Sequence, residues 1–203
     1  MSNFGGNALV VYYSFDRETW TLWDYSDISL ADGETVYMYG DNGGDGGQFS
    51  ESDYIYSRFS MTGSLAAGGN IMSLLGEDFE NYTAVGKYCF YRLFYNCSAL
   101  KSTPRFPATI LEKRCYCEAF LKTGIIESPY LPADPNKERC YLSMFMGCNS
   151  LSKITFGGDS WNTSNAAAWV TGVAATGTFI CKPSLSISAG TGGIPSGWTR
   201  VDL

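Results

Sequence analysis

Residues 140–151 read Cys-Tyr-Leu-Ser-Met-Phe-Met-Gly-Cys-Asn-Ser-Leu, and this stretch decides how the whole chain is interpreted. Residues 89–100 read Cys-Phe-Tyr-Arg-Leu-Phe-Tyr-Asn-Cys-Ser-Ala-Leu, which follows the same order of apolar and polar positions. A copy between them starts at Cys115, so the first cysteines of successive copies lie 26 and then 25 residues apart. A fixed period of this length predicts a solenoid, in which each unit buries its apolar face against its neighbours.

Each copy is predicted to contain one short helix and one strand. The first half of a copy places apolar residues at helical spacing. In the last copy these residues are Cys140, Met144, Phe145 and Cys148. Gly147 suits the left-handed position that ends a helix, and Leu151, Ile154 and Phe156 then fit a strand with one buried face. One helix and one strand per period predict an α/β repeat with leucine-rich-repeat geometry.

The wording of residues 140–151 resembles the BspA-like leucine-rich repeats of anaerobic gut bacteria and their phages. Residues 131–133 (Leu-Pro-Ala) and 106–109 (Phe-Pro-Ala-Thr) are similar to the Leu-Pro-Ala-Thr step of that family. The flanking stretches 69–75 and 193–198 also look like its members. The resemblance implies a short BspA-type solenoid, and it implies surface attachment or binding as the broad function, although a fold alone does not fix a function.

The resemblance covers residues 54–203 well and the beginning of the chain more loosely. Together with the repeats, it divides the chain into three predicted regions. These are an N-terminal small antiparallel β region at 1–50, the solenoid at 51–160 with repeats near 89–114, 115–139 and 140–156, and a C-terminal capping region at 161–203.

The N-terminal region is predicted to form a three-stranded meander. Strands are expected at 9–13, 19–23 and 35–39, because alternating apolar residues are separated there by turn signals. Cross-strand aromatic contacts are expected to stabilise this small sheet. The side chains concerned are Trp20, Trp23, Tyr37 and Tyr39.

The glycine-rich loop 40–47 follows the meander. Asp41 and Asp45 match two positions of an EF-hand calcium loop, but two further side-chain ligands are missing from the pattern. We therefore interpret the loop as a flexible hairpin connection. Two more strands, at 54–65 and 71–75, are expected to lead into the repeats.

After the third copy the period is expected to stop. Ser164 or Asn165 can cap a short helix that runs through Val170. Residues 178–181 are expected to form a last strand, over which the chain folds back. Trp198 is then the predicted lid of the solenoid, because a stack of repeats must hide its last apolar face.

Composition excludes several classes of function. The chain has 203 residues, a net charge of −6 and no histidine. An acidic chain without a basic patch does not suit nucleic-acid binding, and the lack of histidine removes the commonest general base and metal ligand. No apolar run approaches the roughly 18 residues of a membrane span.

The beginning of the sequence carries no recognisable export signal. Residues 1–11 have neither the basic segment nor the long apolar segment of a signal peptide. We expect either that an export signal was trimmed or that the protein reaches its place without the secretion machinery. The places expected are a virion or a bacterial cell surface.

Six of the seven cysteines lie in the repeats and are predicted to be small buried thiols that line the solenoid core. Cys97 and Cys148 are expected to face the strand, with Thr123 in their place in the shorter copy. A disulfide between adjacent copies is the alternative. Cys115 and Cys117 are too close together for a zinc knuckle, so we expect neither a metal ion nor a cofactor.

No candidate nucleophile has a catalytic partner in the sequence. Two carboxylate pairs, Glu118 with Glu127 and Asp134 with Glu138, could in principle hydrolyse a glycosidic bond. The repeat pattern places these carboxylates on the surface without a formed cleft, and acid–base catalysis requires substrate within hydrogen-bonding reach. The chain is therefore predicted not to be an enzyme.

The strands of the repeats are predicted to display a binding face. Ser102, Glu127 and Lys153 should point outward, with Arg105 and Tyr130 at the strand ends. Equivalent positions carry different side chains, which fits a rigid scaffold with a variable surface and equally fits an idle solvated surface. The first hypothesis is a non-enzymatic recognition or attachment module that binds a protein or glycan on a bacterial surface.

The second hypothesis is a structural virion component of a bacteriophage, such as a fibre, cap or decoration protein. Its partners would be neighbouring virion proteins, and an oligomer is compatible with the sequence. Neither hypothesis requires nucleic acid or a membrane span.

Overall fold

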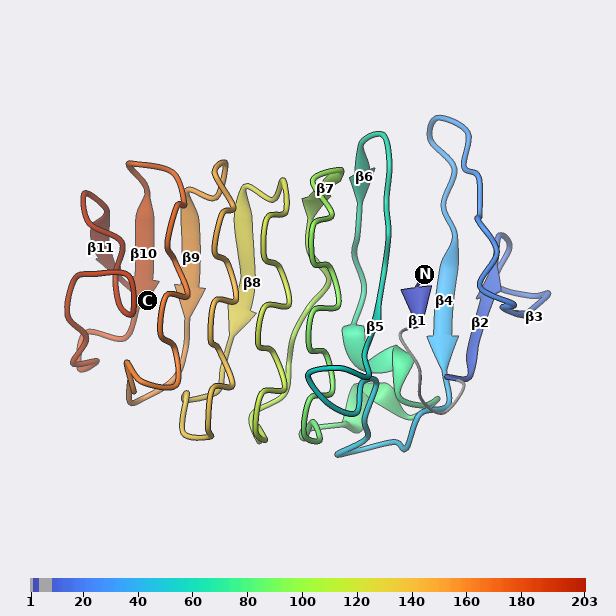
Figure 1. Cartoon of the computed structure of the whole chain (residues 1–203), viewed down its shortest axis with the longest axis horizontal. Coiled ribbons are helices and arrows are strands. Elements are labelled where there is room, and N and C mark those ends of the chain that lie inside the picture. Colours follow the sequence, from blue (N-terminus) through green and yellow to red (C-terminus); the bar gives the residue numbers. More distant parts are fainter. Residues whose placement is uncertain (1, 4–8) are drawn as a thin grey trace.

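The computed structural model describes residues 2–3 and 9–203, and its strands stack side by side along one long axis (Figure 1). Residues 1 and 4–8 of the predicted N-terminal region lie outside the described residues. The structure is a β-solenoid, which confirms the prediction of a repeat solenoid. The described residues contain no α-helix, so the chain is mostly β.

Parallel strands form one face of the solenoid. A four-stranded sheet has the order β11-β10-β9-β8. Its strands are β8 (Glu127–Leu131), β9 (Lys153–Phe156), β10 (Thr178–Cys181) and β11 (Thr199–Asp202). Next to it, β6 (Leu65–Ala66) and β7 (Leu100–Ser102) form a parallel pair. Lys153 pairs with Thr178 and Phe156 with Cys181, so the period of the repeats continues beyond the third copy.

The opposite face consists of tight turns, and the helix predicted in each copy is wrong. In residues 88–97 every second backbone N–H donates to the carbonyl three residues earlier, as Tyr91 does to Tyr88 at 3.0 Å. The other N–H groups donate to the next copy, as Phe90 does to Cys115 at 2.8 Å. An α-helix would satisfy all of these groups internally, so this ladder holds adjacent turns of the solenoid together instead.

A left-handed residue recurs every four residues along this face. Tyr88, Arg92 and Asn96 have φ angles of 57°, 57° and 61°. A four-residue unit returns positions i and i+4 to the same side, as a helix does, so the apolar spacing alone did not separate the two structures. Each side chain at a positive φ carries conformational strain, which the hydrogen bonds between turns offset.

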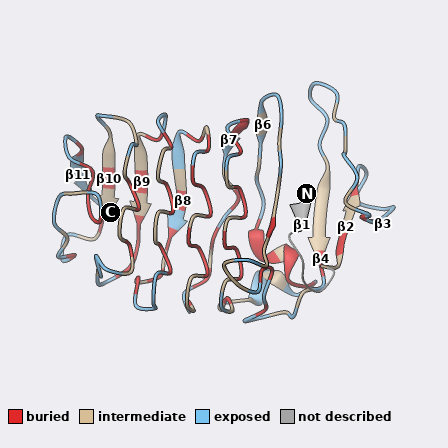
Figure 2. Ribbon diagram, viewed as in Figure 1, coloured by how far each residue is buried: buried red, intermediate tan, exposed pale blue. Residues whose placement is uncertain are grey.

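Stacked aromatic rings fill the space between the two faces. Neighbouring rings of the first stack have centroids 5.3–5.7 Å apart and lie within 20° of parallel. This stack consists of Phe59, Phe94, Phe120 and Phe145. A second stack contains Phe90, Tyr116 and Tyr141. Figure 2 shows buried residues recurring at the same places in successive turns; each buried ring contributes about 1.5–3 kcal/mol.

The predicted burial of the cysteines is confirmed. All seven are free thiols and buried. The Sγ of Cys148 donates to the carbonyl of Phe120 at 2.9 Å and lies 3.2 Å from the hydroxyl of Thr123. Cys97 makes the matching bond to Phe59 at 3.2 Å. Thr123 therefore takes the cysteine position in the shorter copy, as predicted.

The N-terminal sheet is antiparallel but is not the predicted meander. It contains β2 (Val11–Ser14), β3 (Thr21–Leu22) and β4 (Tyr37–Gly40) in the order β3-β2-β4. Trp23 leaves the sheet, is buried, and stacks on Phe59 of the solenoid at 6.3 Å. The chain after Trp23 does not return beside β3; β4 pairs instead with the other edge of β2, which is therefore the middle strand.

The glycine-rich loop 40–47 is fixed to a neighbouring segment by hydrogen bonds and is not the predicted flexible hairpin. The Oδ1 atom of Asp45 accepts the N–H groups of Thr83 and Ala84 at 2.8 and 2.7 Å. Among the described residues, no cluster of three acidic, cysteine or histidine side chains could hold a metal ion. Asp45 is therefore a structural bridge between the loop and the first repeat.

The segment before the repeats contains less β-strand than predicted. In place of the strand at 54–65 lie β5 (Ser57–Arg58), which pairs with β1 (Ser2–Asn3), and the start of β6. In place of the strand at 71–75 lies a 3₁₀ helix, η1 (Ile71–Leu74), whose N-cap Asn70 accepts the N–H of Met72 at 3.1 Å. A second 3₁₀ helix, η2 (Phe79–Asn81), follows.

The C-terminal region first adds further turns to the solenoid and then forms its end. The helix predicted through Val170 is wrong, because Tyr141 N donates to Asn165 O and Phe145 N to Trp169 O, as in the earlier copies. The predicted strand at 178–181 is confirmed as β10. Trp198 is nearly buried at this end, and its indole N–H donates to the carbonyl of Ala174 at 2.7 Å. Within the part of the chain that is described, no helix is long and apolar enough to cross a membrane.

Candidate functional site

A groove lies between the N-terminal sheet and the first turn of the solenoid, with a volume of about 1450 Å³. Its N-terminal wall includes Trp20, Ile28, Tyr37 and Tyr39. Its solenoid wall includes Phe59, Met61, Leu65 and Phe94. Charged side chains lie at its rim, among them Arg17, Glu77, Glu80 and Arg105. An apolar concavity with a few polar groups at its border is the usual form of a binding site.

Among the described residues, the hydrogen bonds that join the two walls lie at one end of the groove. The amide of Asn42 donates to the carbonyls of Val10 at 2.8 Å and Leu74 at 2.7 Å. The hydroxyl of Ser73 donates to the carbonyl of Met38 at 3.3 Å. Beyond these bonds β4 and β6 end their respective sheets and are not paired with each other, and Figure 1 shows β1 between β4 and the first turn of the solenoid.

The N-terminal wall presents an aromatic platform. Tyr39 stacks on Tyr12 at 4.9 Å and meets the edge of Trp20 at 4.7 Å. Burial raises the pKa of Tyr39, and the nearby Tyr12 adds to this effect. The guanidinium of Arg17 lies 4.0 Å from the centroid of the Tyr37 ring. Such rings offer flat apolar area together with polar edges, which suits both peptides and sugars.

The structure separates the five predicted site residues. Arg105 lines the groove and forms an ion pair with Glu80 at 2.9 Å. Ser102 is exposed, but its hydroxyl donates to the carbonyl of Ala67 at 2.8 Å. Glu127 and Lys153 form an ion pair at 3.1 Å between β8 and β9.

Tyr130 is half exposed on β8, and its ring lies over Gly157 of the next turn, where an added Cβ would clash with the tyrosine hydroxyl. Glu127, Tyr130 and Lys153 thus share the flat strand face, whereas Arg105 belongs to the concave groove. Binding by any of the five remains a prediction.

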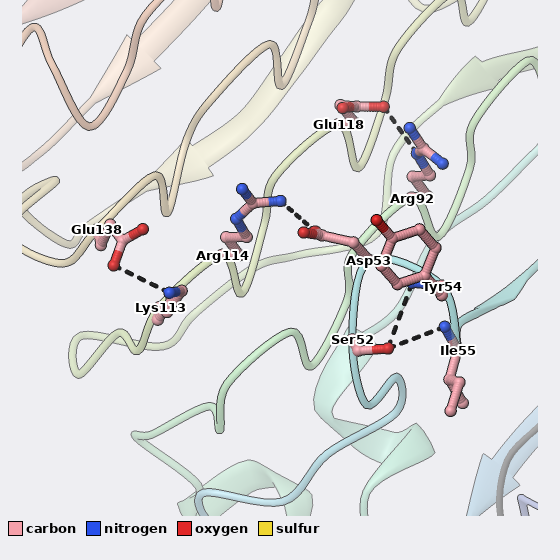
Figure 3. Close-up of polar contacts among 9 residues, drawn as sticks. All are labelled: Ser52, Asp53, Tyr54, Ile55, Arg92, Lys113, Arg114, Glu118 and Glu138. Atoms are coloured by element: carbon pink, nitrogen blue, oxygen red, sulfur yellow. Dashed lines mark hydrogen bonds and ion pairs between the residues drawn. The ribbon is translucent and has the colours of Figure 1, made fainter.

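A second exposed surface lies on the turn face, where the loop 51–56 is anchored (Figure 3). Asp53 forms an ion pair with Arg114. The hydroxyl of Ser52 accepts the N–H groups of Tyr54 and Ile55 at 3.3 and 3.0 Å. Tyr54 is 86% exposed at the tip of this fixed loop. An exposed tyrosine on an anchored loop suits protein contact, because its ring has only two rotatable bonds and loses little side-chain entropy on binding.

Arginine and tyrosine side chains surround this loop. The guanidinium of Arg92 lies 4.9–5.2 Å from the ring centroids of three tyrosines. These are Tyr56, Tyr91 and Tyr95. Arg92 is also bonded to Glu118 at 2.7 Å. Sequence reasoning missed both this surface and the groove; the run of tyrosines in residues 82–95 was the available signal for the first.

The carboxylates proposed as a possible catalytic pair are each engaged by a separate partner. Glu118 binds Arg92, Glu138 binds Lys113 at 3.0 Å (Figure 3), and Glu127 binds Lys153.

Asp134 bridges to the next turn by accepting the N–H of Asp159 at 2.7 Å and the hydroxyl of Ser160 at 2.7 Å. Burial alone would raise the pKa of Asp134, but the hydrogen bonds from Ser160 bring it below its usual value. This carboxyl group is therefore held ionised as a structural bridge.

The buried thiols are poorly suited to nucleophilic chemistry. Burial, and then the charge of Glu118, raise the pKa of Cys117 above its usual value, although Arg114 opposes the shift. The thiolate is the reactive form. Cys117 therefore remains a protonated core residue at neutral pH.

Comparisons of the chain with protein-family models, with curated proteins and with solved structures find no match. Its function is therefore inferred from the groove and the exposed surfaces.

Proposed function

We propose that this protein is a non-enzymatic recognition or attachment module whose ligand, a protein or a glycan, binds in the groove. The observation that carries this proposal is the concavity itself, with aromatic side chains on both walls and charges of both signs at the rim. A site of this kind supplies apolar contact area and a few orienting polar groups. The engaged carboxylates and protonated thiols support a binding role over a catalytic one.

We further propose that the repeats belong to the BspA-like leucine-rich-repeat type and act at a bacterial cell surface or on a virion. The support is the resemblance of residues 140–151 to that family and the single strand in each period of 25 or 26 residues. This assignment concerns the type of repeat; the groove proposal does not depend on it.

A binding screen against bacterial glycans and peptides of envelope proteins tests the proposal. Three single variants locate the site: Trp20→Ala in the groove, Tyr54→Ala on the turn face and Tyr130→Ala on the strand face. Because a large aromatic anchor usually dominates a site, Trp20→Ala should weaken binding by about tenfold or more. The other two should stay within about threefold of the parent.

Thermal unfolding of each variant serves as the control for folding. Trp20 is 37% exposed and meets the ring of Tyr39, so its truncation should lower the melting temperature by a few degrees while leaving one cooperative unfolding transition. Failure to find any saturable ligand would count against the proposal. So would a ligand whose affinity depends on Tyr54 or Tyr130 and not on Trp20.

One observation favours a structural virion component as the second candidate. β11 ends the main sheet, its four residues are exposed, and it carries Val201, with Leu203 exposed just beyond it. An exposed apolar edge strand is a surface on which another chain can assemble. Mass spectrometry of purified virions, together with the sedimentation mass of the isolated chain, tests this candidate; absence from virions and a monomeric mass would reject it.

A further inference from the structure

We propose that the ligand of the groove is an extended polypeptide segment, which adds as a β-strand between β4 and the segment 65–69. This inference rests on the proposed function and names its ligand class. An extended peptide can pair directly with the main-chain groups of the two walls.

The N-terminal wall offers a free strand edge. β4 pairs with β2 and with no other strand among the described residues. In an antiparallel pair, the two main-chain groups of a residue point either both toward the partner strand or both away from it. The carbonyl of Met38 accepts a bond from Ser73, on the side away from β2. The N–H of Met38 therefore faces the same edge, where the carbonyl of Met38 is already bonded to Ser73 at the closed end of the groove.

The solenoid wall offers a second free edge. Leu65 N donates to Ala99 O, while the carbonyls of Ala67 and Gly69 accept bonds from Ser102 and Arg105, all on the side of the next turn. β6 ends at Ala66 and Gly69 has a φ of 77°, so the alternation of a regular strand does not extend along this segment. Across a planar trans peptide, the N–H points opposite to the carbonyl of the preceding residue. The N–H of Gly68 therefore points away from the next turn and toward the groove, which Gly68 lines.

The same turn of the solenoid already accepts an added strand. β1 pairs antiparallel with β5, with Ser2 opposite Arg58 and Asn3 opposite Ser57. Figure 1 shows β1 in the interval between β5 and β4. Strand addition in the groove would continue this existing mode of pairing along the next part of the same turn.

The composition of the solenoid wall favours a peptide over a glycan. Residues 66–69 read Ala-Ala-Gly-Gly, so small side chains leave the main chain accessible. A strand presents donors and acceptors at every second residue, which matches an edge of this kind. Its side chains would then alternate between the aromatic platform around Trp20 and the solvent side of the groove.

Selection of short random peptides displayed on phage, with the complete chain as bait, provides the probe, and an array of bacterial glycans is run in parallel. The expected result is a peptide whose binding is saturable and weakened by Trp20→Ala. Methylating its backbone nitrogens one at a time should weaken binding about tenfold or more at alternate positions. At the positions between them, the affinity should change by less than about threefold.

A matched pair of variants tests the solenoid edge. An added Cβ at Gly68 meets nothing within 4 Å. Gly68→Ala keeps the N–H and should bind the selected peptide as the parent does, whereas Gly68→Pro removes it and should weaken binding by about tenfold. The methylation series on the peptide decides the question on its own if the proline variant unfolds.

The outcomes separate this inference from the proposed function. A selected peptide that tolerates methylation at every nitrogen overturns strand addition, and so does a failure to select any peptide. If a glycan binds saturably, its affinity depends on Trp20 and no peptide binds, the proposal of a recognition module is supported and the proposal of a peptide ligand is rejected. If neither kind of ligand binds, both proposals fall.

Discussion

The solenoid, from β5 to β10, and the N-terminal sheet of β2, β3 and β4 share one aromatic core but close it in different ways. In the solenoid every second N–H bonds to the next turn, and Phe94, Phe120 and Phe145 stack in register. In the N-terminal region Trp23 continues the stack on Phe59, but the surrounding strands are antiparallel, and among the described residues their hydrogen bonds to the solenoid lie at one end.

This difference shows where a repeat protein can form a concave site. Successive turns of the repeat pair along their strands, as β8 and β9 do. A turn that lacks its regular neighbour leaves main-chain edges and apolar side chains unmatched. The groove lies at the position where the repeat is interrupted, so its walls are less tightly held than the solenoid.

The largest expected effect comes from removing a ring from the regular stack. Phe120 is fully buried between Phe94 and Phe145. Phe120→Ala should lower the free energy of unfolding by about 3–5 kcal/mol, because it removes apolar contacts and leaves a cavity. Phe15, 52% exposed in the N-terminal region, is the matched control; Phe15→Ala should change stability by less than about 0.5 kcal/mol. Urea unfolding measures the free energy of both variants. Equal losses of stability in Phe120→Ala and Phe15→Ala would contradict the difference proposed between the two regions.

A smaller effect should come from relieving strain on the turn face. Lys122 and Gly147 occupy equivalent positions in adjacent turns and have φ angles of 57° and 75°. Lys122→Gly should raise the free energy of unfolding by about 0.5–1 kcal/mol, because glycine tolerates this backbone conformation. Gly147→Ala should lower it by about 1 kcal/mol for the same reason. A loss of stability in Lys122→Gly would show that the strain is not relieved there.

Acid should destabilise the N-terminal region through Asp16. The N–H groups of Thr19 and then Glu18 bond to its carboxylate and lower its pKa from 3.8 to about 2. The unfolded chain therefore binds more protons between these two values, and stability falls as the pH decreases through that range. In Asp16→Asn this decrease should be shallower when urea unfolding is followed at a series of pH values. An unchanged slope would exclude Asp16 as a contributor.

Reductant is expected to have no effect on the melting temperature. All seven cysteines are free, so no disulfide closes a loop of the chain. Burial raises the pKa of Cys97 and of Cys140 to about 11, so both should react slowly with iodoacetamide in the native protein. Denaturation should expose all seven thiols. A recovery of only five in unreduced protein would indicate a disulfide and an oxidising location.

Sequence reasoning recovered the parts of the fold that depend on burial alone. The period, the strands at 153–156 and 178–181, the buried Cys148 and the lid formed by Trp198 follow from which residues must avoid water. The turns at 88–97 did not follow, because a four-residue period and a helix bury the same positions. Most residues in these turns are not of a type that predicts a left-handed conformation. Gly147 is such a residue, whereas Arg92 adopts a positive φ although its residue type does not indicate it.

The groove could not be predicted from the sequence for a different reason. It depends on the strand order β3-β2-β4 and on packing between distant parts of the chain, such as Trp23 on Phe59, and not on any local pattern. Arg105 was chosen for its place at a strand end, yet its position at the groove follows from the same long-range packing. Local sequence signals do not specify contacts of this kind.

Hydrogen exchange with and without saturating ligand is the most direct test that the groove is the binding site. The account predicts slower amide exchange in residues 35–40 and 59–70 when the selected ligand is bound, with no change in 113–147 of the solenoid. Protection confined to the strand face around β8 and β9, or to the loop 51–56, would contradict it.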